Sequence, residues 1–217
     1  MSSFLDHLTA VVAGTVVLLT LMTLQTRDRV EVVEGTVSDV ARKLATSTAD
    51  VLAQEFDNAL SEPMARAALG GYRCRLVRDA TNERTSTVEV PAYVRTTQGG
   101  AAVPAHVQYR LQDTGRTVAV GGRTLRTYRL LREVDRGSGY AAATVIADGV
   151  VDFDVKFRGR ATETFAGAPP LRFSQIEFQV VIATPPPRAL PGRTRTRETN
   201  SARASFTVRP PNFATDA

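Results

Sequence analysis

Three hydrophobic patterns follow one another along this chain. Residues 8–24 carry no charge, apolar residues then recur at helical spacing to Leu60, and from Tyr72 onward apolar and polar residues alternate. No proline interrupts residues 1–62, so the first two patterns predict one continuous helix roughly 85 Å long. The uncharged front half has the composition of a helix in a bilayer, and the amphipathic rear half that of a helix in water.

The first pattern predicts a membrane anchor. Its 17 uncharged residues reach the lower limit of the ~17–25 residues that a spanning helix needs, although four threonines weaken its apolar character. The start of the chain lacks the basic residues and the small-residue cleavage site of a secretory signal. We therefore predict a retained transmembrane anchor over residues 1–26.

The second pattern predicts an amphipathic helix over residues 27–62. Its apolar stripe recurs in steps of mostly three and four residues, at Val30, Val33, Val37, Val40, Leu44, Val51, Leu52, Phe56 and Leu60. We expect this stripe to pack on the chain's own sheet. Because four of its members repeat every seven residues, a short coiled coil with another helix is the alternative.

Residues 63–217 predict an antiparallel sheet, because apolar and polar residues alternate with period two. A Gly-Gly pair between two such runs marks a hairpin turn at Gly121 and Gly122. The expected strands are 85–95, 106–112, 117–120, 123–134, 150–158, 173–182 and 204–208. The predicted fold class is thus α+β, with a long N-terminal helix (membrane half plus amphipathic half) packed on an antiparallel β-sheet domain.

Charge adds one candidate binding segment. The net charge is +5, and residues 61–217 hold 23 basic against 14 acidic side chains, nearly all of the basic ones arginine. The arginines alternate along strands, so we predict no nucleic-acid partner. The one dense cluster lies in a Pro- and Arg-rich loop over residues 184–203, with Arg188, Arg193, Arg195 and Arg197 as a partner-binding or simply solvated surface.

Candidate chemistry is sparse. Cys74 is the only cysteine, so no intrachain disulfide forms, and neither His7 nor His106 has an evident partner in the sequence. No phosphate-binding or metal motif appears. Asp152 shares a strand face with other charged residues and is expected to face solvent, while a calcium site built with Asp148 is the alternative. We predict a protein that is not an enzyme, has no cofactor and has no small-molecule substrate; an enzyme using Asp152 or Cys74 is a weaker reading.

Several runs resemble the type IV pilin-like family, in particular minor pilins and J-type minor pseudopilins of type II secretion. The resemblance rests on the helix followed by the runs Val107-Gln-Tyr-Arg-Leu111, Tyr128–Val134, Ile146–Val155 and Ile176–Ile182. It implies a structural minor subunit that assembles into a filament through its N-terminal helix. The implied partners are other pilin-like subunits and the lipid bilayer. The alternative is a membrane-anchored envelope domain that binds a protein partner without forming filaments.

The resemblance also implies assembly residues at the start of the chain. Family members carry a basic leader that ends in Gly before a Phe, whereas here Phe4 follows a serine and no basic residue precedes it. If Met1 is removed, Asp6, with Phe4 and Leu5 before it, takes the place of the Glu that pairs with a neighbour's terminal amine; the alternative is that Asp6 simply lies at the water interface. The implied location is a single-pass inner-membrane protein with its C-terminal domain outside the cytoplasm, although Arg27 and Arg29 favour the opposite orientation.

Overall fold

The structure is a computed structural model that describes residues 2–79, 84–95, 100–158, 174–184 and 200–211. Within the first helix it describes the side chains of residues 15–25 and from residue 35 onward.

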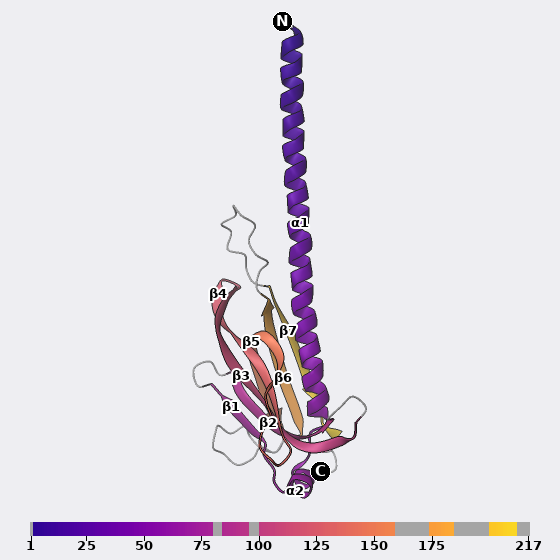
Figure 1. Cartoon of the computed structure of the whole chain (residues 1–217), viewed down its shortest axis with the longest axis vertical. Helices are drawn as coiled ribbons and strands as arrows, with labels where there is room; N and C mark the ends of the chain where they lie inside the picture. The colour runs from indigo at the N-terminus through magenta and orange to yellow at the C-terminus, as the bar shows by residue number, and fades with distance from the viewer. Residues whose placement is uncertain (1, 80–83, 96–99, 159–173, 185–199, 212–217) are drawn as a thin grey trace.

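One long helix organises the molecule. Helix α1 (Ser2–Asp57) runs unbroken through Thr26, and its rear half lies along the sheet while its front half projects beyond it (Figure 1). Its 56 residues span roughly 84 Å at 1.5 Å per residue. In the front half the threonine hydroxyls bond back to the helix itself, Thr20 to the carbonyl of Val16 at 2.8 Å and Thr23 to that of Leu19 at 2.7 Å.

The helix ends earlier than the sequence predicted, because the chain turns to pair with the sheet. Beyond Asp57, the Leu60 N–H donates to the Pro91 carbonyl at 2.8 Å. In the same way the Tyr93 N–H donates to the Asn58 carbonyl at 3.0 Å. A second helix, α2 (Glu62–Leu69), then begins with a proline in its first turn and ends at Gly70 in the left-handed conformation. The sequence analysis did not predict α2.

The rest of the described fold is one antiparallel sheet in which each strand pairs with its neighbours in chain order. Along the chain the two described helices, α1 and α2, come first and the strands β1 to β7 follow in order. The strands are β1 (Arg75–Arg78), β2 (Thr85–Arg95), β3 (Ala102–Val120), β4 (Arg123–Asp135), β5 (Thr144–Arg158), β6 (Gln175–Thr184) and β7 (Asn200–Val208).

The predicted strand positions are largely confirmed. Strand β2 has the predicted bounds, and Gly121 and Gly122 form the turn between β3 and β4 with φ of 54° and 75°. Two predicted runs merge into the long strand β3, because a register shift between Asp113 and Thr117 absorbs the extra residues without ending the strand.

The sheet curls around the end of α1. The Phe56 ring lies 5.6 Å from that of Tyr109 in β3 and 5.4 Å from that of Phe178 in β6. A flat sheet would hold strands three apart at roughly 14 Å, so the sheet must bend for one side chain to reach both. The same curvature lets the Thr85 hydroxyl in β2 accept the Val155 N–H of β5 at 2.9 Å.

Alternating residues divide the sheet into two faces, as predicted. On β5, Phe153, Val155 and Phe157 are buried in the core, whereas Asp152 and Asp154 belong to the opposite, polar face. The core gathers the inward side chains of β1–β7 together with one face of the rear half of α1.

The predicted membrane anchor needs correction. No helix among the described residues is long and apolar enough to cross a membrane. This finding overturns the transmembrane assignment and the single-pass inner-membrane location.

The predicted fold class is corrected with it. The fold is mostly antiparallel β, since the strands hold more residues than the two helices. The division of α1 into a membrane half and an amphipathic half does not stand. The structure instead distinguishes a rear half that lies along β6 and β7 from a front half that projects beyond the sheet (Figure 1).

Candidate assembly surface on the first helix

The front half of α1 exposes apolar side chains on all sides. Between residues 16 and 24 seven large apolar side chains are 51–58% exposed: Val16, Val17, Leu18, Leu19, Leu21, Met22 and Leu24. Successive residues of a helix point about 100° apart, so this run covers the whole circumference. A helix that is apolar all round is normally enclosed by other structure. In this chain the sheet lies too far along the rod to enclose it (Figure 1).

The rear half packs through a different set of residues from those that the stripe predicted. The buried face of α1 consists mainly of the small side chains of Ala41, Ala45, Thr48 and Ala49, followed by the larger Leu52 and Phe56 near its end. Small residues let the helix backbone approach the strands closely, and most of its contacts are with β6 and β7. The Thr48 hydroxyl donates to the Leu44 carbonyl at 2.7 Å, so this buried polar group is satisfied.

The predicted packing stripe is therefore wrong in its central part. Val40, Leu44 and Val51 are 40–47% exposed, and Val37 is half-buried. Among the stripe members with described side chains, Leu52, Phe56 and Leu60 lie in the core. The cause is that the rear helix has two apolar faces, and periodicity does not indicate which one the sheet covers. We call the uncovered set, together with the exposed serine between its members, the outer seam: Val37, Val40, Leu44, Ser47 and Val51.

An ion pair holds the end of α1 to the sheet. Arg132 of β4 donates through Nε to Glu55 Oε2 at 2.9 Å and pairs through its second nitrogen with Glu55 Oε1. The buried Tyr109 hydroxyl donates to the same carboxylate. Both charged side chains are about one-fifth exposed, so this bidentate pair is partly shielded from water. It fixes the rotation of α1 and hence the direction in which the outer seam points.

A buried polar cluster lies on the other face of the sheet, across β2, β3 and β4. Arg73 donates to Asp135 Oδ2 at 2.5 Å and lies 3.5 Å from Glu89 Oε1. The Tyr140 hydroxyl donates to the same oxygen of Glu89 at 2.5 Å, and the Arg73 guanidinium lies 5.8 Å from the Tyr140 ring centre. His106 is buried beside them, with no hydrogen-bond partner for its Nδ1.

The environment of this cluster shifts its pKa values. The hydrogen bond from Arg73, with further bonds from the N–H groups of Gly137 and Gly139, lowers the pKa of Asp135. Burial, followed by the charge of Arg73, lowers the pKa of His106 and keeps the imidazole neutral at pH 7. Burial raises the pKa of the Tyr140 phenol.

We assign the cluster a structural role. The carboxylate of Asp135 accepts bonds from the loop that follows β4, and Tyr140 ties that loop to Glu89. None of these side chains lines the groove around Asp154 and Phe206 or the one around Gln112 and Arg116. The polar groups of the cluster form their hydrogen bonds and ion pairs with one another. The sequence offered no signal for this cluster, because its members are far apart along the chain.

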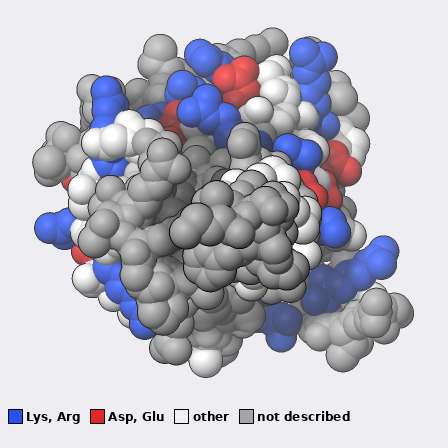
Figure 2. Space-filling view, turned by 90° about the horizontal axis from the view of Figure 1, so that it is seen from above, with Lys and Arg blue, Asp and Glu red and all other residues white. Residues whose placement is uncertain are grey.

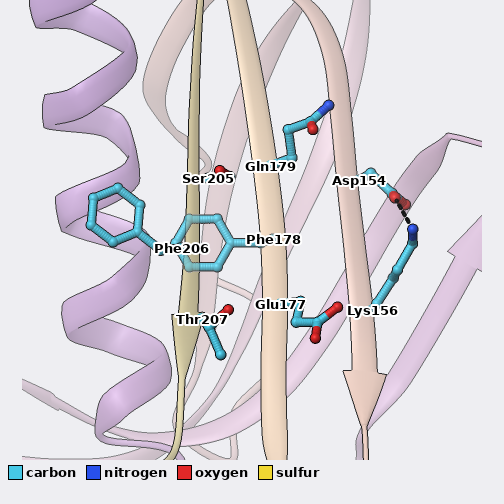
Figure 3. A pocket seen from close by; sticks show the side chains of 8 residues that line it. All are labelled: Asp154, Lys156, Glu177, Phe178, Gln179, Ser205, Phe206 and Thr207. Atoms are coloured by element: carbon cyan, nitrogen blue, oxygen red, sulfur yellow. Dashed lines mark ion pairs between the residues drawn. The ribbon is translucent and has the colours of Figure 1, made fainter.

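The larger groove lies on the polar face of β5, β6 and β7 (Figure 3). It has a volume of about 270 Å³ and is lined by Asp154, Lys156, Glu177, Phe178, Gln179, Ser205, Phe206 and Thr207. Lys156 Nζ lies 3.3 Å from Asp154 on this face. The Phe178 ring is buried in the core and stacks on that of Phe206 at 5.9 Å, so the two rings lie on the opposite face of the sheet from the charged groups. Lys156 pairs with Asp154, while Glu177 and Gln179 bond to Arg158 and Asp152 beside the groove. The groove therefore indicates no particular ligand.

The calcium site at Asp148 and Asp152 remains a prediction. Asp148 lies 3.6 Å from Arg129, and Asp152 accepts a hydrogen bond from Gln179 at 3.1 Å. Among the described residues no group of three or more His, Cys, Asp or Glu side chains could hold a metal ion. Cys74 is fully buried, and that burial raises the pKa of its thiol far above the ordinary value.

Other predicted site residues fall outside the description. Phe4, Leu5 and Asp6 belong to α1, but their side chains are outside the described residues. Arg188, Arg193, Arg195 and Arg197 lie in residues 185–199, also outside them. Their proposed roles in assembly and partner binding remain predictions.

The arginine excess does not form one basic patch on the end face in Figure 2, where basic and acidic side chains are interspersed. Many arginines pair with carboxylates: Arg73, Arg78, Arg110, Arg126, Arg132 and Arg158. Much of the positive charge is thus used within the fold.

Comparison of this chain with protein-family models, with curated proteins and with solved structures finds no match.

Proposed function

We propose that this protein is a structural subunit that assembles through the front half of α1 into a helix-cored filament, with copies of itself or with similar pilin-like subunits. The observation that carries the proposal is the run of seven apolar side chains, each more than half exposed, around the whole circumference of α1. A partner that covered one side only would leave the rest in water. The pattern therefore favours several neighbouring helices around each front half.

The energy available supports association. Burying the remaining exposed surface of seven Val, Leu and Met side chains is worth roughly 7–10 kcal/mol per chain. Association costs an estimated ~4–15 kcal/mol in lost freedom of motion. A single pairwise contact would thus be marginal, whereas a bundle in which each helix meets several others repays the cost.

The rest of the fold suits this role. The clamp between Glu55 and Arg132 and the aromatic contacts of Phe56 join the rear of α1 firmly to the sheet. The sheet is thereby held to one end of the rod, outside a core made by the front halves. The family resemblance adds Asp6 as a candidate partner for a neighbouring chain's terminal amine inside that core, where a lone carboxylate would be costly.

Paired substitutions on the front half test the proposal. Val17→Glu with Leu21→Lys places a charge pair at i, i+4, which retains helix stability while removing the apolar surface. We expect wild-type protein to form large oligomers in sedimentation velocity and filaments by negative-stain electron microscopy. The double variant should remain small, with unchanged helix content by circular dichroism.

The matched control is Val145→Glu, which changes an apolar residue that is 52% exposed on the sheet. It should assemble like wild type. Wild-type protein that stays monomeric, or a double variant that assembles as well as wild type, would refute the proposal.

A further inference from the structure

The outer seam of α1 has the spacing of a coiled-coil interface. Val37, Leu44 and Val51 recur every seven residues, with Val40 and Ser47 three residues after the first two. Positions with this spacing form the buried seam between two helices. The described fold leaves most of the seam uncovered, since Leu44 is 47% exposed and Val40 45%, while Val37 is half-buried.

The fold of the chain itself restricts how another helix can approach. The face that packs on the sheet lies roughly 110° around the helix from the seam. One flank of the seam, with Ala41 and Thr48, is buried against the sheet. The other flank, with Lys43 and Asp50, is exposed. A partner helix can therefore make ionic contacts mainly along the second flank.

The charges on that open flank are complementary to the same flank of a second copy that runs in the opposite direction. Lys43 and Asp50 are one heptad apart and of opposite sign, and neither has an ion-pair partner within the described residues. In an antiparallel pair of helices such positions face each other, so each Lys43 meets the Asp50 of the second copy. A parallel pair would instead place Asp50 opposite Glu55 of the second copy, whose carboxylate is already paired with Arg132, so Asp50 would gain no ion pair.

We propose that the outer seam binds the outer seam of a second copy of this chain in antiparallel orientation. In this register Leu44 packs beside the second copy's Ser47, and Val51 beside its Val40. The small serine leaves room for the leucine that faces it. The contact is isologous, so each packing layer and each Lys43–Asp50 pair occurs twice.

This pairing goes beyond the proposed filament and uses a different surface. The antiparallel arrangement sends the two front halves out in opposite directions, so each remains free to join other chains. The two contacts can be tested separately, because substitutions at residues 17 and 21 lie outside the seam.

The test uses the full chain carrying Val17→Glu and Leu21→Lys, which removes the front-half contact. Sedimentation equilibrium of this protein should show a monomer–dimer equilibrium. Lys43→Glu alone and Asp50→Lys alone should each weaken the dimer about tenfold, because both pairs become repulsive. The double exchange Lys43→Glu/Asp50→Lys should restore dimerisation to near its starting strength.

Two further variants control the experiment. Leu44→Glu should abolish the dimer, and Thr46→Glu, an exposed residue on the side of α1 away from the seam, should not affect it. A protein that is monomeric throughout would overturn the proposal. A dimer that the double exchange fails to restore would overturn it too, since only the antiparallel pairing brings residues 43 and 50 together.

Discussion

Leu52→Ala and Leu44→Ala make the same chemical change about two turns apart on α1. Leu52 is 0% exposed and lies in the core, whereas Leu44 is 47% exposed on the outer seam. Removing a buried Leu side chain costs about 2–5 kcal/mol, because the lost burial is joined by the energy of the cavity left behind. In Leu44→Ala the only buried contact removed is the one between the Leu44 side chain and the helix itself. We therefore expect the free energy of unfolding to fall by less than about 1 kcal/mol.

Urea denaturation followed by far-ultraviolet circular dichroism measures both losses, since the chain has no tryptophan to report by fluorescence. The measurement uses the Val17→Glu/Leu21→Lys protein, at concentrations low enough that dilution no longer shifts the midpoint. The midpoint of Leu52→Ala should fall well below that of Leu44→Ala, with similar slopes. Equal losses, or a larger loss for Leu44→Ala, would refute the assignment of faces and with it the outer seam.

Three other predictions follow from the contacts within the fold. Glu55→Gln should lower the free energy of unfolding by about 1–3 kcal/mol in the same assay, because it leaves a partly buried arginine without its charged partner; an unchanged midpoint would contradict the clamp. Since Arg73 lowers the pKa of Asp135, the stabilisation from this carboxylate is present above about pH 4 and is lost as the pH falls through its folded pKa. Asp135→Asn should therefore destabilise the protein at pH 7, with a difference from wild type that shrinks as the pH falls below about 4. Cys74 should react with a disulfide reagent only as fast as the protein opens, as followed by absorbance, and rapid reaction of the folded protein would show that this thiol is accessible.

Short-range patterns predicted the sheet well. Strand β2 and the Gly121–Gly122 hairpin follow directly from alternation and from the positive φ that glycine permits. The pattern does not reveal α2, because a proline after a helical run normally marks the end of that helix, whereas Pro63 lies in the first turn of a new one. The length of β3 was missed because a bulge lets one strand pass through a break in alternation.

The candidate sites depended on longer-range information. Periodicity located an apolar stripe on α1, but the sheet covers the small residues around Ala45 and Ala49 instead. That choice depends on the shape of the curled sheet, which no local pattern encodes. The buried cluster around His106 was also beyond prediction, because the register that sets His106 beside Asp135 comes from the pairing of β3 with β4.

Crosslinking through the front half of α1 tests the central claim most directly. Cysteines placed singly at Leu18 and Thr20 lie on opposite sides of the helix, and the buried Cys74 serves as an internal reference. If several chains surround each front half, both variants will form covalent dimers on mild oxidation, whereas a cysteine at Val145 on the sheet will not. Front-half cysteines that remain unlinked while the full chain is folded would contradict the account.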